Sequence, residues 1–213
     1  LRLLATLGES ELSVSEITHV LRQSQPRVSR HLKLLTDAGL ITRFREGSWV
    51  FYRLETRGAY GQLAHKLLEF LPEDDPVVMR DRERLADVRA ERAQQAAEYF
   101  KANAAEWSEV RALYVPEKQV EEAVTSMMEQ QRVPVLIDLG TGTAQMLELL
   151  AGIAETAIGY DINHDMLNVA RANLERKGLA HCHVRYGDIL SLPEPAASAD
   201  VVVIHQVLHF LDD

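Results

Sequence analysis

Residues 133–144 read VPVLIDLGTGTA, an apolar, β-branched run that is followed at once by a glycine turn. The run predicts a buried strand, with Asp138 near its end. Gly140 and Gly142 let the backbone of the turn approach a ligand closely, and the small side chain of Ala144 permits a following helix to pack on the strand. Strand, turn and helix in this order predict a nucleotide-binding α/β unit.

A second predicted strand also ends in an acidic residue, at a sequence separation that is typical of nucleotide-binding folds. The apolar run 156–160 ends in Asp161, which lies 23 residues after Asp138. That spacing suits a carboxylate placed to bind ribose hydroxyls in a dinucleotide-binding type of fold. Further elements are expected as a helix that starts at Asn163 or His164 and ends at Lys177, and as strands over about 181–186 and 200–204. This alternation implies a parallel sheet with its ligand at the carboxyl ends of the strands.

The N-terminal part has a different, helical pattern. Ser13 or Ser15 can cap a helix, and Glu16 lies three residues after Ser13, as a capping box requires. The apolar face of this helix would consist of Ile17, Val20 and Leu21. A second helix begins near Pro26 and ends at Gly39. Its buried stripe would consist of Val28, Leu32 and Leu35.

The opposite face of the second helix is polar and basic. It carries Gln25, Arg27, Ser29, Arg30 and His31. These donors can reach phosphates and base edges in a major groove, as expected of a recognition helix. Two strand-like runs, 40–45 and 49–54, then predict a hairpin shaped as a wing, with Val50, Tyr52 and Leu54 directed to the core. The alternative is a packed mini-domain whose basic face is merely solvated.

Charge and composition divide the chain and exclude several classes of protein. The net charge is −9, but residues 1–57 hold nine Lys/Arg and six Asp/Glu, a net charge of +3, whereas residues 58–213 have a net charge of −12. This asymmetry indicates two domains with different partners. The composition excludes collagen-like and disordered chains, and no apolar run approaches the ~20 residues of a membrane-spanning helix. The single cysteine, Cys182, favours a reducing compartment, and we expect a cytoplasmic protein.

A charged, proline-containing segment, 71–76, separates the two halves. A helical stretch over about 77–107 follows, and its many oppositely charged pairs would stabilise a largely solvated connecting or dimerisation helix. An aromatic patch near its end consists of Tyr99, Phe100, Trp107, Arg111 and Tyr114. These side chains either cap a cofactor cleft or pack the helix on the second domain. The chain lacks an initiating Met and stops at Asp213 just after a strand-like run, so we expect a piece of a longer protein.

Residues 24–32, SQPRVSRHL, together with 38–41 and 47–54, resemble the winged-helix repressors of the ArsR family. The resemblance covers about residues 1–70 and implies a homodimer that binds a double-stranded DNA operator. The residues that it assigns to DNA are Ser24, Gln25, Arg27, Ser29, Arg30, His31 and Arg45.

Many members of that family bind metalloids through a Cys-Val-Cys element, which is Ser13-Val14-Ser15 in this chain. Hydroxyls are poor ligands for thiophilic ions, so no arsenic-type site is expected. A second sensing site of the family uses His and carboxylates on the last helix. His65 and Glu69 lie one turn apart there but lack further ligands, so no metal is expected at that position either.

The later motifs resemble the class I S-adenosylmethionine-dependent methyltransferases. They are residues 136–142, 159–162, 166–167, 187–189 and 199–202. The resemblance covers about residues 95–213 and implies a Rossmann-like fold with S-adenosylmethionine or S-adenosylhomocysteine as the cofactor. The cofactor-binding residues that it implies are Asp138, Gly140, Thr141, Gly142, Asp161, Ile162, Met166, Asp188, Ile189 and His205. The sheet of the family normally has seven strands, and four are readable here.

The same resemblance implies a role for each residue. Asp138 and the glycine turn would lie near the methionine part of the cofactor, and Asp161 would bind the ribose hydroxyls. Asp188 would accept from the adenine amino group. The apolar side chains around the adenine would be Ile162, Met166 and Ile189. His205 would face the sulfonium and the substrate.

Catalysis is less clearly marked than cofactor binding. Methyl transfer needs mainly in-line positioning, so no base has to be conspicuous, and His205 is the one candidate for a catalytic residue. His205 and His209 could also bind a metal, or simply begin an amphipathic helix, and we expect no metal. Arsenite methyltransferases use several cysteines, and Cys182 alone is too few.

We therefore expect an α/β chain with an α+β winged-helix domain over 1–71, a helical connector or lid over 72–115 and a Rossmann-like domain over 116–213 that is truncated after its fourth strand. The function expected first is a transcription regulator whose second domain binds the cofactor and tunes repression. The alternative is an active methyltransferase for a small molecule, with the winged helix used for autoregulation or dimerisation. A third is a protein-interaction module that has lost both ligands.

Overall fold

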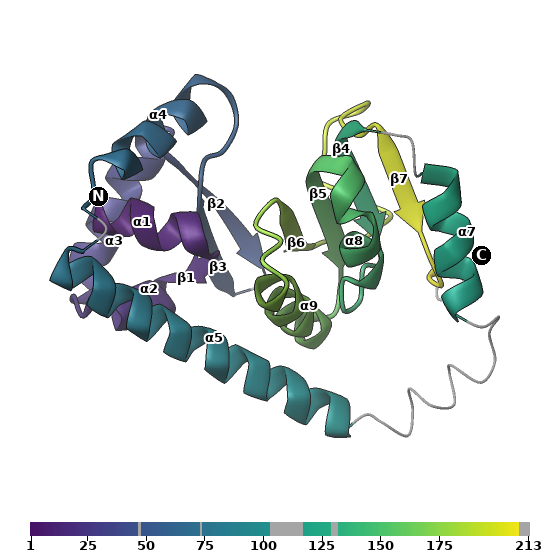
Figure 1. Ribbon diagram of the computed structural model, residues 1–213, viewed down its shortest axis with the longest axis horizontal. Helices are drawn as coiled ribbons and strands as arrows, with labels where there is room; N and C mark the ends of the chain where they lie inside the picture. Colours follow the sequence, from purple (N-terminus) through teal and green to yellow (C-terminus); the bar gives the residue numbers. More distant parts are fainter. Residues whose placement is uncertain (47, 73, 103–116, 129–131, 209–213) are drawn as a thin grey trace. The chain divides into compact units, whose positions relative to one another are not determined.

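A computed structural model describes residues 1–46, 48–72, 74–102, 117–128 and 132–208 of the chain (Figure 1). The chain divides into two compact units, Leu1–Glu91 and Arg92–Asp213. The division falls inside the expected connector, 72–115, so the domain limits at 71 and 116 stay predictions. Each unit is described by itself.

The first unit is a winged helix, as predicted. Its elements are α1 (Arg2–Glu9), β1 (Leu12–Ser13), α2 (Val14–Leu21), α3 (Gln25–Asp37), β2 (Ile41–Glu46), β3 (Trp49–Leu54), α4 (Gly58–Glu69) and the first part of α5 (Pro76–Ala102). The three strands form an antiparallel sheet in the order β1-β3-β2. The apolar stripes predicted for α2 and α3 contribute to one core, in which Leu12, Ile17 and Leu32 are fully buried.

The start of α2 follows the capping box predicted from the sequence. Ser13 is the N-cap, and its hydroxyl accepts from the Glu16 amide at 3.4 Å, while the Glu16 carboxylate accepts from the Ser13 amide at 2.7 Å. The Ser13 hydroxyl also lies 3.0 Å from that of Ser15. Both donors at the helix start are therefore satisfied locally.

The prediction for the inward side of the wing was wrong in part. Leu54 is buried and Tyr52 packs against the core, but Val50 is only half-buried. Phe51, which alternation directs to the other side of the sheet, is buried as well. Its ring stacks on Phe44 of β2 with centroids 5.7 Å apart, so an aromatic pair across the two strands covers the second side of the hairpin.

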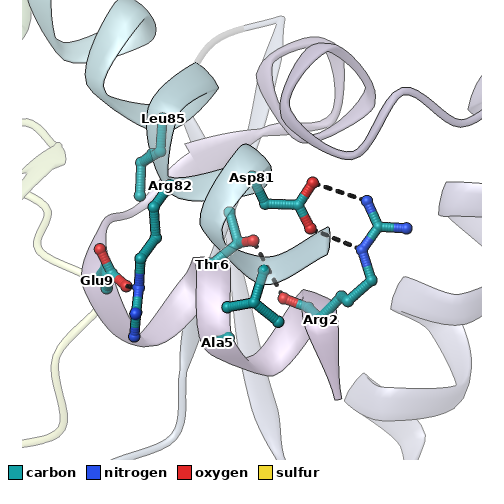
Figure 2. Close-up of a pocket in the computed structure, with 8 residues that line it drawn as sticks. Arg2, Ala5, Thr6, Glu9, Asp81, Arg82 and Leu85 are labelled. Carbon is teal, nitrogen blue, oxygen red and sulfur yellow. Dashed lines mark hydrogen bonds and ion pairs between the residues drawn. The ribbon is translucent and has the colours of Figure 1, made fainter. Parts of the chain in front are cut away.

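The prediction that the long helix is largely solvated was also wrong for its first part. Val78, Leu85 and Val88 of α5 are buried, and the last two belong to the winged-helix core. A buried carboxylate, Asp81, lies in the same part of the helix at 4% exposure. It accepts from Arg2 Nε at 2.6 Å and from Arg2 Nη2 at 2.7 Å (Figure 2).

Asp81 is the centre of a small charged network between α1, α2 and α5. Arg84 donates to Asp81 at 3.1 Å and to the carbonyl of Val20, and Arg2 donates to the carbonyl of Leu21. The pKa of the Arg2 guanidinium is raised, chiefly by its hydrogen bond to Asp81. Beside this network, a small cavity is lined by Arg2, Ala5, Thr6, Glu9, Val78, Asp81, Arg82 and Leu85. Figure 2 shows that the second ion pair at its rim joins Glu9 and Arg82.

The second unit is a parallel α/β fold, again as predicted. Its elements are the last part of α5, then α7 (Glu117–Met128), β4 (Val133–Leu139), α8 (Gln145–Leu150), the short helix η1 (Ala151–Ile153), β5 (Ala154–Asp161), α9 (His164–Arg176), β6 (Cys182–Tyr186) and β7 (Val201–Ile204). The strands are parallel in the order β6-β5-β4-β7. The strand order reverses at β4, which makes its carboxyl end the expected ligand position.

Both faces of this sheet are covered. On one face, Leu136, Ala157 and Val184 pack with residues of α8 and α9. On the other, Ile137, Leu139, Ile158 and Tyr160 pack with Ile189, Leu192 and Ala199 from the segment after β6. Cys182 is buried in the first of these cores, and burial raises the pKa of its thiol to about 12.

The end of α5 packs on α9. Tyr99 contacts a cluster of Ala96, Val169 and Ala172, and Arg92 pairs with Glu175 at 2.6 Å. For Tyr99 this agrees with packing on the second domain; Trp107, Arg111 and Tyr114 lie outside the described residues, and nothing is stated of the Phe100 side chain. Among the helices that the structure describes, none has the length and apolar character needed to cross a membrane.

We expect Asp81→Ala to destabilise the first unit by about 2–3 kcal/mol, because it removes a buried carboxylate and leaves two partly buried guanidinium groups without it. The matched control is Arg82→Ala, which breaks the more exposed pair with Glu9 and should cost at most about 1 kcal/mol. Urea unfolding followed by circular dichroism measures both. Equal losses in the two variants would contradict the structural role of Asp81.

Candidate functional site

The turn after β4 is held to the end of β5 by backbone hydrogen bonds. The amides of Gly140 and Thr141 both donate to the carbonyl of Tyr160, at 2.8 and 2.9 Å. Gly140 has φ +71°, and a Cβ there would lie 2.2 Å from the side chain of Val207. A side chain at this position would therefore adopt a strained backbone conformation and would also clash with Val207.

Asp161 is fixed by two backbone donors before any ligand binds. Its Oδ2 accepts from the amide of Gly142 at 2.9 Å, and its Oδ1 accepts from the amide of Asn163 at 2.8 Å. Asn163 in turn caps α9, since its side chain accepts from the amides of Asp165 and Met166. A carboxylate has about four acceptor sites, so Asp161 retains capacity for two further donors such as a pair of ribose hydroxyls.

The space above the turn is open. Gly142 has φ +52°, and among the residues that the structure describes, its own atoms and its two chain neighbours aside, none has an atom within 4 Å of the position that a Cβ would occupy. An open glycine next to an oriented carboxylate fits the sugar and methionine parts of a nucleoside cofactor. The next side chain after the acid, Ile162, is 62% exposed, which leaves an apolar surface beside it.

Asp138 is the most perturbed acid near the turn. It is 2% exposed, and Thr141 Oγ1 donates to its Oδ2 at 2.6 Å. Burial raises the pKa of Asp138 from 3.8 to about 6; the hydrogen bond from Thr141 opposes this shift, and the charge of Asp161 adds to it. The Thr141 side chain fits because residue 159 is glycine, where a Cβ would lie 2.4 Å from Thr141 Oγ1.

The remaining residues predicted to bind the cofactor lie at the same edge of the sheet. Asp188 follows β6, and its Oδ1 accepts from the Leu190 amide at 2.9 Å. Ile189 packs against the buried cluster that contains Tyr160, and Met166 is half-buried in the first turn of α9. His205 is half-buried directly after β7, whereas His209 lies outside the described residues.

Sequence reasoning missed the residues that hold this edge together. Thr141 was named for its place in the turn, but its contact with Gly159 was not foreseen, and neither was the role of Tyr160. The signal available was the pair of glycines at strand ends, Gly159 and Gly187. A glycine in a strand or at its end often marks a close approach of another group.

The residues predicted to contact DNA form an exposed surface on the first unit. Ser24, Gln25, Arg27, Ser29, Arg30 and His31 are all exposed around the start of α3, and Arg45 is exposed on β2. Ser24 is the N-cap position of α3 but makes no side-chain capping hydrogen bond, so its hydroxyl is not used by the helix. Arg43 is exposed two residues before Arg45, on the same side of the strand, and was missed although strand alternation could have found it.

Two family models match separate parts of the chain. Residues 1–43 match the bacterial regulatory protein, arsR family, and residues 137–213 match a methyltransferase domain. The chain joins an arsR-family helix-turn-helix segment to a methyltransferase-domain segment.

Curated relatives of the arsR-family segment are regulators. Over 46 residues the chain is 54% identical to the arsenic resistance transcriptional regulator ArsR1 of Pseudomonas putida. This matched stretch covers 22% of this chain and 36% of that protein. Over 52 residues it is 50% identical to the arsenical resistance operon repressor of Escherichia coli, 24% of this chain and 43% of that protein. The chain thus spans less than half the length of each of these two relatives.

Solved structures resemble part of this chain. They include a SAM dependent methyltransferase from Aquifex aeolicus, at 20% identity, covering 50% of this chain and 60% of that one with a TM-score of 0.42. The YcgJ protein from Bacillus subtilis matches at 22% identity, covering 45% of this chain and 41% of that one, also with a TM-score of 0.42.

We expect Asp138→Asn to stabilise the second unit at neutral pH. The unfolded chain loses this proton near pH 4 and the folded chain near pH 6, so the folded state binds more protons in between, and the free energy of unfolding falls as the pH rises through that window. One pKa unit corresponds to about 1.4 kcal/mol, so ionisation of Asp138 lowers the free energy of unfolding of the wild type by on the order of 3 kcal/mol. The uncharged amide of Asp138→Asn does not ionise and avoids this loss.

Melting temperatures from pH 4 to 8 measure this difference. The curves of the wild type and Asp138→Asn should diverge up to about pH 6 and run parallel above it. Asp87→Asn, at an exposed position on α5, is the control and should show no divergence. Parallel curves for Asp138→Asn over the whole range would contradict the raised pKa.

Proposed function

We propose that this protein is a DNA-binding transcription regulator whose second domain binds S-adenosylmethionine or S-adenosylhomocysteine, and that cofactor occupancy changes its affinity for operator DNA. The observation that carries the cofactor part is Asp161, a carboxylate oriented by the amides of Gly142 and Asn163 next to open space. Both activities belong in the cytoplasm.

The described residues fit a nucleoside cofactor that lacks a pyrophosphate. The turn has two glycines rather than the three of a pyrophosphate-binding loop, and acids stand at the ends of β4 and β5. Carboxylates at this edge disfavour a phosphate and favour hydroxyls, amines or a cationic sulfonium. When bound, S-adenosylmethionine supplies an electrophilic methyl group on sulfur. The chain itself orients the ribose through Asp161 and keeps a buried acid, Asp138, near the turn.

The DNA part is supported by the exposed start of α3. Arg27 and Arg30 are exposed there with Gln25 and Ser29, while Val28 and Leu32 of the same helix are buried. Helix N-terminal residues that donate hydrogen bonds suit a major groove, and the exposed Arg45 on β2 suits a flanking phosphate. A homodimer would present two such helices to a palindromic operator.

Regulation by the cofactor requires different cofactor affinities in the DNA-competent and DNA-incompetent states. The second candidate function is methyl transfer to a small molecule. The match of residues 137–213 to a methyltransferase domain favours it, together with His205 at the end of β7 as a group that could face an acceptor.

We expect Asp161→Ala to weaken binding of S-adenosylhomocysteine by about tenfold or more, because hydrogen bonds from two hydroxyls to a charged acceptor are lost. Calorimetric titration of the protein with S-adenosylmethionine and S-adenosylhomocysteine measures this effect. Asp165→Ala is the matched control, since it removes the same charge from an exposed position four residues later. Unchanged binding in Asp161→Ala would exclude the proposed ribose contact.

We expect the double variant Arg27→Ala/Arg30→Ala to bind a mixed-sequence DNA duplex about tenfold more weakly and with a smaller salt dependence, because phosphate contacts release counterions. The control is Arg80→Ala/Arg82→Ala, which removes two exposed positive charges from α5. Fluorescence anisotropy at several salt concentrations compares them. Equal losses in both variants would argue against α3 as the DNA-binding surface.

The same proteins separate the two candidate functions. Methyl transfer that persists in Arg27→Ala/Arg30→Ala would show that catalysis does not depend on DNA binding. Equal DNA affinity of the wild type with and without saturating cofactor would exclude regulation by cofactor occupancy. Methyl transfer to a small molecule would then be the remaining candidate function.

A further inference from the structure

We propose that Tyr160 is a positioning residue: its hydroxyl and ring hold the segment 187–194 in the shape that lets Asp188 select a purine carrying an amino group. This inference rests on the proposed cofactor site and adds to it the residue that would set base selectivity. The juxtaposition that carries it is one buried side chain contacting both ends of that segment.

Tyr160 stands where the loops of the candidate site meet. It is 2% exposed at the penultimate position of β5, and its carbonyl accepts from the glycine turn through Gly140 and Thr141. Those hydrogen bonds belong to the backbone. A change of the side chain therefore leaves the turn tied to β5.

The side chain of Tyr160 acts on the segment after β6. At its start, a Cβ on Gly187 would lie 2.7 Å from the tyrosine Cδ1, so the ring fits only because residue 187 is glycine. The Gly187 amide donates to the Asp161 carbonyl at 3.1 Å, which joins this end to the ribose-binding acid. At the other end, the tyrosine hydroxyl donates to the carboxylate of Glu194. Both ends are thus held by one residue.

Asp188 lies between these two attachments. Its Oδ1 accepts from the Leu190 amide and its carbonyl accepts from the Ser191 amide, both at 2.9 Å. Within the described part of the chain, no hydrogen bond is made to its Oδ2, and the side chain is exposed. Ile189 packs in the cluster that contains Tyr160. The tight turn therefore leaves one carboxylate oxygen of an exposed Asp188 available as an acceptor, which suits an exocyclic amino group.

The hydroxyl of Tyr160 can be removed without removing the ring. Tyr160→Phe keeps the contact with Gly187 and the packing of Ile189, and it releases only the Glu194 end. Glu194→Ala releases the same end from the other side, whereas Glu194→Gln keeps an oxygen that can accept from the hydroxyl. Tyr52→Phe, in the first unit, is the control for loss of a tyrosine hydroxyl elsewhere.

The test titrates each protein with S-adenosylhomocysteine and with S-inosylhomocysteine, in which an oxo group replaces the amino group. In Tyr160→Phe and Glu194→Ala, affinity for the adenosyl compound should fall about tenfold, the factor for one hydrogen bond to a charged group, while affinity for the inosyl compound stays within about twofold. Glu194→Gln and Tyr52→Phe should match the wild type. The double variant should lose no more than either single one.

A second readout needs no cofactor. Hydrogen exchange of the Leu190 and Ser191 amides should be faster in Tyr160→Phe than in the wild type, because the turn that protects them is released at one end. Equal loss of affinity for both compounds, or unchanged exchange at these amides, would overturn the proposal. A wild type that binds neither compound would overturn the proposed function and the base selectivity together, and the exchange data would then still decide whether Tyr160 holds the segment.

Discussion

The candidate cofactor site depends on the hydrogen bonds between the turn after β4 and the end of β5. Leu139 and Tyr160 are partners in the parallel register, so the two strands end side by side. Three consecutive amides, those of residues 140–142, then reach across to the Tyr160 carbonyl and the Asp161 carboxylate. A ligand would meet an acid that is already oriented, which lowers the ordering cost of binding.

Much of this arrangement follows from local sequence pattern. Apolar runs that end in Asp138 and Asp161 predict two buried strands, and parallel neighbours bring their carboxyl ends to one edge. The same logic predicts Asp188 there. The pattern could not show that Thr141 binds Asp138 or that Tyr160 reaches Glu194, because these contacts depend on how segments pack. Residues 160 and 194 are separated by 34 positions, and no periodicity links them.

The winged helix shows a similar limit. The capping box joins Ser13 and Glu16, which are only three positions apart, so the sequence predicts it directly. For α5, the abundance of charged residues favoured a solvated helix, although Val78, Leu85 and Val88 lie on one helical stripe. Asp81 made that apolar stripe harder to find, because a charged residue in a sequence is normally taken as exposed. Its burial can be explained only once its partners, Arg2 and Arg84, are placed. Phe51 likewise is recognisable as a buried residue on the second side of the hairpin only once its partner Phe44 is placed.

The buried position of Cys182 bears on how this protein can be studied by chemical labelling. Maleimides and similar reagents attack the thiolate, and a thiol with a pKa raised to about 12 inside a packed core supplies almost none of it at neutral pH. It is also the only cysteine of the chain. A dye or spin label can therefore be directed to one new cysteine on the exposed side of α3 or near Gly142, with the native residue left in place and the core undisturbed.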